Sequence, residues 1–133
     1  MKLVILLLSL TLLLFSSNVF SATLKVPSQY STIQAAINAS VNGDTVLVAA
    51  GTYSGAINFN NKLITLISES GATGTAISGN NTATTVTLTG LENGSTRLIG
   101  FTITNGNPYG IICNGSSSPT ILTTCILSLL LSI

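Results

Sequence analysis

The sequence carries very little charge. Its 133 residues include four Lys and Arg and three Asp and Glu, which gives a formal net charge of +1. Proteins that bind nucleic acid present clusters of basic side chains, and anionic membrane surfaces attract polybasic segments. The chain contains no such cluster, so we expect no nucleic-acid partner and a surface made mainly of Ser, Thr and Asn.

Residues that commonly carry catalysis are also scarce. Histidine is absent and Asp44 is the single aspartate. Serine and cysteine nucleophiles usually need a histidine partner, and so do most zinc sites. The glycine-containing segment 71–74 lacks the lysine of a phosphate-binding loop. We therefore expect a non-catalytic chain with no cofactor and no metal, in which Glu69, Glu92 and the strand-opening Arg97 are solvated.

Only two cysteines are present, Cys113 and Cys125. Both lie in apolar segments, where a buried free thiol is a common role for cysteine. An exported protein can also keep a disulfide. The spacing leaves both possibilities open.

The N-terminal segment has the form of a secretory signal peptide. Lys2 is followed by an apolar run from Leu3 to Phe15, and compact residues end the segment at Ser21. The run is shorter than the roughly 20 residues of an ordinary membrane span. We predict cleavage between Ser21 and Ala22 and a secreted, periplasmic or cell-surface protein without stable membrane insertion after cleavage. An uncleaved anchor is the alternative.

The stretch from Ser31 to Tyr53 organises the rest of the chain. Ser31 and Gln34 have the spacing of a capping box, which predicts a helix start. The apolar residues of this stretch recur at helical spacing and form one stripe; they are Ile33, Ala36, Ile37 and Val41. The stripe predicts a short amphipathic helix over residues 32–41 that covers the open end of the fold.

A tight turn and a buried strand follow this helix. Asn42 and Gly43 tolerate left-handed backbone and are expected to end the helix. Asp44 is expected to cap backbone N–H groups in the helix-to-strand turn. Three consecutive apolar residues within 45–49 indicate a strand buried on both faces, as in a parallel sheet. Gly51 closes the unit.

Short strands punctuated by Gly and Asn fill the remainder. After an entry strand within 22–30, we predict strands at 45–49, 56–59, 63–68, 75–78, 84–89, 97–104, 109–113 and 119–123. Such spacing is typical of a sandwich or a solenoid. Apolar–Thr–apolar triplets recur, which favours stacked coils with inward apolar ladders. Their central residues, Thr65, Thr87 and Thr102, are predicted to line one polar face.

The chain also resembles a known family. The segment TIQAAINASVNGDTVLVAAGTYSGAINFNNKLITLIS, the later GFTITNG and the SPTI at 118–121 are similar to the repeats of secreted, pectin-lyase-like proteins. The resemblance covers about residues 26–121. It implies an all-β fold, a right-handed parallel β-helix with a short N-terminal capping helix. The enzymes of this superfamily use acidic clusters that this chain lacks, so the resemblance specifies the fold rather than the activity.

The apolar N-terminal run, the resemblance and the change of composition after residue 121 divide the chain into three parts. Residues 1–21 form the predicted signal peptide, 22–121 the N-terminal part of a β-helix domain, and 122–133 an apolar tail. The tail lacks the turn residues that separate earlier strands. We expect either a truncated piece of a longer β-helix protein or an apolar cap on the last coil; a lipid-anchor signal fits less well because its polar spacer is too short.

Three functions are consistent with these features. The first is an exported non-catalytic module for surface adhesion or carbohydrate binding, with a polysaccharide or glycan as partner. The second is a truncated remnant of a polysaccharide lyase or hydrolase, and the third is a structural N-terminal cap of a longer surface repeat protein. Candidate ligand contacts are Tyr53, Tyr109 and Arg97, whereas Phe59 and Phe101 are expected in the core. An uncovered solenoid end also predicts end-to-end self-association.

Overall fold

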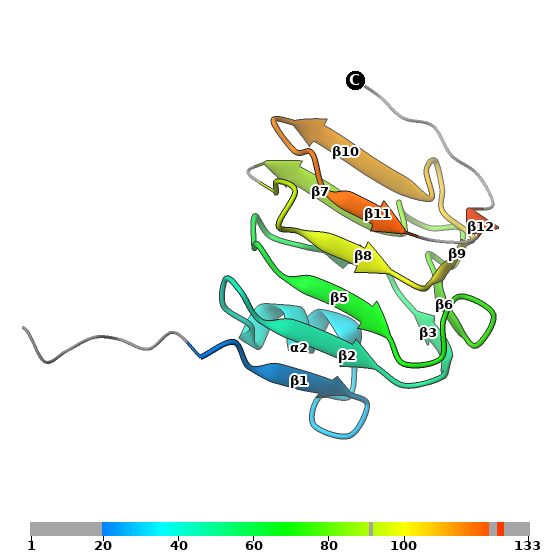
Figure 1. The fold of residues 1–133 in the computed structure, drawn as a ribbon. Coiled ribbons are helices and arrows are strands. Elements are labelled where there is room, and N and C mark those ends of the chain that lie inside the picture. The colour runs from blue at the N-terminus through cyan, green and yellow to red at the C-terminus, as the bar shows by residue number, and fades with distance from the viewer. Residues whose placement is uncertain (1–19, 91, 123–124, 127–133) are drawn as a thin grey trace, which may run out of the picture.

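The chain folds into a parallel β-solenoid of about four turns with one short helix (Figure 1). The computed structural model describes residues 20–90, 92–122 and 125–126. Its elements are β1 (Thr23–Val26), α2 (Ile33–Ala39), β2 (Thr45–Val48), β3 (Gly51–Ser54), β4 (Ile57–Asn58), β5 (Thr65–Ser68), β6 (Thr75–Ser78), β7 (Val86–Gly90), β8 (Arg97–Ile99), β9 (Thr102–Thr104), β10 (Ile111–Gly115), β11 (Thr120–Leu122) and β12 (Cys125–Ile126).

The strands form three sheets that wrap around one core. Sheet A has the order β1-β2-β5-β8-β11, sheet B the order β12-β9-β6-β3, and sheet C the order β10-β7-β4. Every described strand pair is parallel. Because each sheet takes one strand from each successive turn, residues at equivalent positions of successive turns stack into rows. The predicted solenoid is therefore confirmed.

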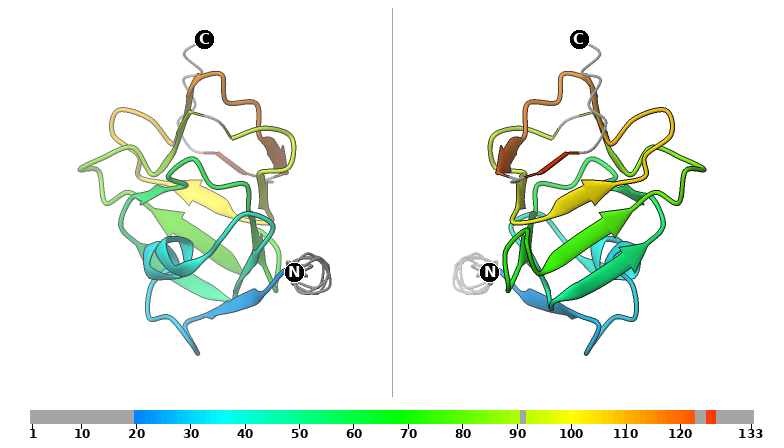
Figure 2. Two further views of the ribbon diagram at one scale, coloured as in Figure 1. Left: turned by 90° about the vertical axis from the view of Figure 1, so that its left-hand side faces the viewer. Right: turned by 90° about the vertical axis from the view of Figure 1, so that its right-hand side faces the viewer.

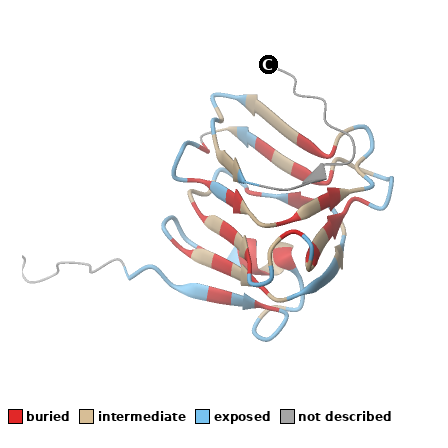
Figure 3. Cartoon of the chain, turned by 45° about the vertical axis from the view of Figure 1, so that its right-hand side comes forward, coloured by how far each residue is buried: buried red, intermediate tan, exposed pale blue. Residues whose placement is uncertain are grey.

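Inward rows of aliphatic side chains fill the solenoid. In sheet A the row runs Leu24, Val46, Leu66, Leu98 and Ile121, and in sheet C it runs Ile57, Val86 and Ile111. Along most strands buried residues alternate with half-buried or exposed ones (Figure 3), as a period of two requires. Phe59 and Phe101 are fully buried at corners between strands, which confirms their predicted place in the core.

The helix starts one residue later than the capping box predicts. Thr32 is the N-cap, and its side chain accepts a hydrogen bond from the N–H of Ala35 at 3.1 Å. Ser31 is exposed in front of the helix. Gln34 does not reach back to the N-cap but extends to β4. The capping-box prediction is therefore wrong, because adjacent Ser and Thr are both good caps and tertiary packing selects between them.

The helix also ends earlier than predicted. Ile33, Ala36 and Ile37 are buried, but the helix stops at Ala39 with Ser40 as its C-cap, and Val41 is 58% exposed. Val41 therefore does not belong to the covering stripe. Gly43 adopts a φ of +94° in the turn that follows the helix.

The three threonines predicted to share one polar face lie in three different sheets. Thr65 belongs to β5 in sheet A, Thr87 to β7 in sheet C, and Thr102 to β9 in sheet B. The prediction is wrong because similar triplets occur in all three sheets. The outward threonine row lies instead on sheet A, where Thr23, Thr45, Thr65, Arg97 and Thr120 are in register.

The first turn of the solenoid is incomplete. It contributes β1 to sheet A, and α2 packs near β4 of sheet C, but sheet B begins only with β3 in the second turn. Figure 2 shows the strands stacked in rungs above β1, with α2 beside the lower rungs. The position of one strand below β3 is thus vacant among the described residues. The predicted strands do not include β3, because Gly51–Ser54 lacks an apolar triplet.

The last described strands extend the solenoid into the segment assigned to the apolar tail. Leu122 belongs to β11, and β12 pairs with β9 through Cys125 and Ile126. The remaining tail residues and most of the predicted signal peptide lie outside the described residues.

Candidate functional site

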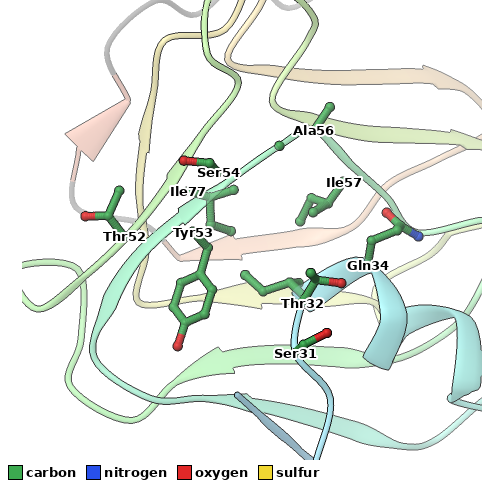
Figure 4. Close-up of a pocket in the computed structure, with 11 residues that line it drawn as sticks. Ser31, Thr32, Gln34, Thr52, Tyr53, Ser54, Ala56, Ile57 and Ile77 are labelled. Atoms are coloured by element: carbon green, nitrogen blue, oxygen red, sulfur yellow. The ribbon is translucent and has the colours of Figure 1, made fainter.

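A pocket of about 510 Å³ lies at the vacant strand position, between the start of α2 and β3 (Figure 4). Ligand pockets in proteins commonly have volumes of about 300–1,000 Å³. Its lining combines hydroxyl, amide, aromatic and aliphatic groups without a charged residue; the residues are Ser31, Thr32, Ile33, Gln34, Thr52, Tyr53, Ser54, Gly55, Ala56, Ile57 and Ile77.

The free edge of β3 forms one wall of the pocket. The N–H groups of Gly51 and Gly55 donate to the carbonyls of Gly74 and Ser78 in the neighbouring turn. Because main-chain groups of a strand alternate in direction, those of Thr52 and Ser54 face away from β6, toward the vacant position. This edge therefore offers donors and acceptors to a ligand that lies along β3.

Tyr53 places an aromatic ring in the pocket. Its row in sheet B continues through Ile77, Ile103 and Ile126, so Tyr53 is the first inward residue of that sheet. The hydroxyl donates to the carbonyl of Ala49 at 3.0 Å, which fixes the ring orientation. A Cβ on Gly51 would lie 3.7 Å from the ring, so the ring covers this glycine. The residue is half-buried and presents an aromatic surface at the open end of the core.

Negative charge lies near the hydroxyl end of Tyr53. Burial, followed by the charge of Glu69, raises the pKa of the Tyr53 phenol. Glu69 is exposed, as predicted, and its N–H donates to the carbonyl of Val48, beside Ala49. The electrostatic environment of the pocket is therefore neutral to negative.

The opposite corner of the first turn is closed by side chains. Gln34 accepts from the N–H of Asn58 at 2.7 Å and donates to the carbonyl of Asn58 at 3.1 Å. Its amide thus pairs with the edge of β4 as a neighbouring strand would. The predicted capping role of Gln34 is local, whereas this contact joins residues 24 positions apart.

Lys62 closes the end of the helix. Its Nζ donates to the carbonyls of Ile37, Asn38 and Ser40 at 2.6, 2.7 and 2.7 Å. These carbonyls lie at the C-terminal end of α2, which lacks intrahelical partners for its last carbonyls and carries partial negative charge. A positive charge there stabilises the helix and joins it to the β4–β5 connection.

The structure separates the three predicted ligand contacts. Tyr53 lines the pocket, whereas Arg97 is exposed on the outer side of β8 in sheet A, and Tyr109 lies in the β9–β10 connection, where its carbonyl accepts from Thr85. Of the three residues, Tyr53 is the one that lines this pocket. Arg97 is solvated at a strand start, as the sequence predicts.

Glu92 is not the solvated loop acid that the sequence predicts. Its side chain is fully buried, Oε1 accepts from the N–H of Asn61 at 3.1 Å, and Oε2 has no hydrogen-bond partner among the described residues. The backbone of Ser118 donates to the Glu92 carbonyl at 2.7 Å, which draws the β10–β11 connection toward it. This contact joins segments 26 residues apart, so local sequence does not reveal it.

Cys113 is a half-buried free thiol on β10. Burial, followed by the charge of Glu92, raises the pKa of this thiol. It packs against the apolar core, in agreement with the predicted core role. The side chain of Cys125 lies outside the part of the chain that the structure describes.

Within residues 20–90, 92–122 and 125–126, no helix has the length and apolar character to cross a membrane. The same residues contain no group of three or more His, Cys, Asp and Glu side chains that could hold a metal ion. Comparison with protein-family models, curated proteins and solved structures gives no match.

Proposed function

We propose that this chain is an exported, non-catalytic β-solenoid module that binds a neutral glycan in the pocket beside Tyr53. The observation that carries the proposal is the composition of this pocket, which combines one aromatic ring with hydroxyl side chains and a free strand edge. Sugars present apolar ring faces and many hydroxyl groups, so a site for them needs an apolar surface and several polar partners.

The shape of the pocket favours a linear chain. The hollow occupies the position of one missing strand, and its walls are β3 and the start of α2. A peptide strand could also pair with such an edge, but only Thr52 and Ser54 present main-chain groups there. The facing wall includes the hydroxyl side chains of Ser31 and of Thr32, the latter also capping the helix. Hydroxyl groups on both walls suit a ligand with hydroxyl groups on both edges.

The charge near the pocket favours a neutral sugar over a uronic acid. No lining residue is positively charged, and Glu69 places negative charge near Tyr53. Lys62 is bonded to helix carbonyls and Arg97 lies on sheet A. A uronate carboxylate in the pocket would therefore meet repulsion without a compensating cation.

Export and membership of the pectin-lyase-like superfamily belong to the same proposal. They are supported by the N-terminal apolar run, the repeat motifs and the parallel solenoid. The proposed preference for neutral sugars differs from the uronide chemistry of the superfamily's lyases. In this proposal the chain shares their scaffold but binds its ligand at the first turn, beside Tyr53.

The test is retention on an array of linear glycans that includes neutral glucans, galactans and mannans beside polygalacturonate. The proposal predicts retention on one neutral class and loss of retention in Ser31→Trp, which fills the pocket from its exposed rim. Ser95→Trp is the matched control, because Ser95 is exposed in the β7–β8 connection, away from the pocket. Absence of retention on every neutral glycan, or equal loss in both variants, would contradict the proposal.

A further inference from the structure

Asp44 is a buried carboxylate whose two oxygens hold two distant segments. It is 4% exposed. Its Oδ2 accepts from the N–H of Val41 at 2.8 Å, at the exit of the helix, and its Oδ1 accepts from the N–H of Ala22 at 2.8 Å, just before β1. The predicted capping role of Asp44 is therefore confirmed, and it extends to the N-terminal strand.

Ala22 is also the residue that the sequence places directly after the cleavage point. The hydrogen-bonded ladder of sheet A begins here, because the Ala22 carbonyl accepts from the N–H of Thr45 at 2.8 Å. The preceding Ser21 is exposed and donates from Oγ to the carbonyl of Gly43. The predicted cleavage junction thus coincides with the atom that contacts Asp44.

We propose that cleavage between Ser21 and Ala22 turns this contact into a partly buried ion pair that locks the mature N-terminus onto the first turn. The inference rests on the proposed export and is independent of glycan binding. An export-linked endopeptidase would add one water across the peptide bond, leaving a carboxylate on Ser21 and an α-amino group on Ala22. This amine takes up a proton at neutral pH and becomes an ammonium.

The new ammonium meets the Asp44 oxygen that already accepts from the same nitrogen. A hydrogen bond between two charged groups is roughly twice as strong as one between neutral groups. An ammonium also offers three N–H donors, and removal of Ser21 frees the nearby carbonyl of Gly43, which Ser21 now occupies. Partial burial of the pair protects it from screening by salt.

The lock matters for the site because Asp44 connects β1, the helix exit and β2. It directly precedes β2 and accepts from the N–H of Val41, the residue that follows the C-cap of α2. The first turn of the α2 helix lines the glycan pocket. Cleavage between Ser21 and Ala22 would therefore stabilise the first turn, where the solenoid is incomplete. The uncleaved chain would lack this stabilisation.

The first measurement is the N-terminus of the exported protein, by intact mass and N-terminal sequencing. The proposal predicts that the mature chain begins with Ala22. Any other first residue would overturn it, because the ammonium would then lie away from Asp44. This result does not bear on glycan retention, which the array measures separately.

The second measurement is a four-protein cycle on the mature chain. The N-terminus is either free or acetylated, and Asp44 is either kept or replaced in Asp44→Asn, which retains one acceptor oxygen. We expect acetylation to raise the equilibrium constant of unfolding about tenfold when Asp44 is present, and to change it less than about twofold in Asp44→Asn. Equal effects of acetylation in both backgrounds would overturn the ion pair.

A single-residue extension keeps the test decisive if Asp44→Asn does not fold. A mature chain that begins with Ser21 moves the ammonium by one residue but preserves the Ala22 N–H donor. The proposal predicts that this chain is less stable than the chain beginning with Ala22 and that acetylation affects it less than twofold. Equal stability of the two unacetylated chains would contradict the lock.

Discussion

Two corners of the first turn differ in how they end a parallel sheet. At the edge of sheet C, the Gln34 amide bonds both main-chain groups of Asn58, and Lys62 binds three carbonyls at the end of α2. At the edge of sheet B, β3 leaves the main-chain groups of Thr52 and Ser54 facing a pocket. One corner is closed by side chains of the chain itself, and the other opens onto a pocket that we propose as the ligand site.

The difference shows that one part of a solenoid end can be covered while another part stays open. Exposed strand edges promote pairing with other chains, and proteins usually cover them with helices, loops or charged residues. Here a seven-residue helix is long enough to cover one sheet edge but not two. The uncovered edge is short and is bounded by Gly51 and Gly55, both with positive φ, which limits regular strand addition.

Lys62→Met, at the closed corner, should lower the free energy of unfolding most. It removes three charge-assisted hydrogen bonds while keeping most of the aliphatic side chain, so the helix carbonyls lose their partner. We expect the free energy of unfolding to fall by about 2 kcal/mol, measured by urea denaturation. Lys25→Met is the matched control, because Lys25 is exposed on β1, and it should change stability by less than about 0.5 kcal/mol. Similar losses in both variants would refute the role of Lys62.

Gln34→Ala should have a smaller effect on the same corner. It removes the amide that pairs with Asn58, whose exposed main chain can then bond to water. We expect a loss of about 1 kcal/mol in the free energy of unfolding and faster hydrogen exchange of the Asn58 amide. Unchanged exchange at Asn58 would show that Gln34 does not close the edge of β4.

Of the three variants, Tyr53→Phe, at the open corner, should lower the free energy of unfolding least at neutral pH. It keeps the ring but loses the bond to Ala49, at a cost of about 1 kcal/mol or less. Because the pKa of Tyr53 is raised in the folded chain, its stabilising contribution is complete below the unfolded pKa of about 10 and is lost as pH rises through the folded value.

The free energy of unfolding, measured between pH 8 and 11, would test whether this contribution is lost as pH rises. Tyr53→Phe should lose less stability above pH 10 than the wild type does. Cys113→Ala offers a comparison on the other end of the solenoid, because the pKa of Cys113 is also raised. An alkaline loss that is identical in the wild type and in Tyr53→Phe would contradict the account of Tyr53.

The repeating part of the fold could be predicted from sequence because each strand carries its own pattern. Predicted strands at 75–78 and 45–49 agree with β6 and β2, and the inward aliphatic rows follow from alternation. The prediction of one strand over 97–104 is less accurate, since Gly100 with a φ of +75° separates β8 from β9 at a corner. Corners depend on single backbone angles, which periodicity does not show.

The site was only partly predictable because its geometry depends on contacts across turns. The sequence predicts Tyr53 as a candidate ligand contact, but nothing local indicates the missing strand beneath it. Glu92 next to Asn93 and Gly94 has the sequence of an exposed turn, and it is buried by contacts with segments around Asn61 and Ser118. The repeats differ in length, so the sequence does not show which residues stack. The pocket can be located only once the register of the sheets is known.

The most direct test of the central claim is an NMR titration of the 15N-labelled protein with linear neutral hexasaccharides. Binding at the open corner predicts saturable shifts of the Thr52 and Ser54 amides, with small changes at Asn58 on the closed corner. Hexagalacturonate should shift the same amides weakly, and more strongly in Glu69→Gln. Shifts centred on Arg97 or Tyr109, or no shifts with any neutral hexasaccharide, would contradict the account.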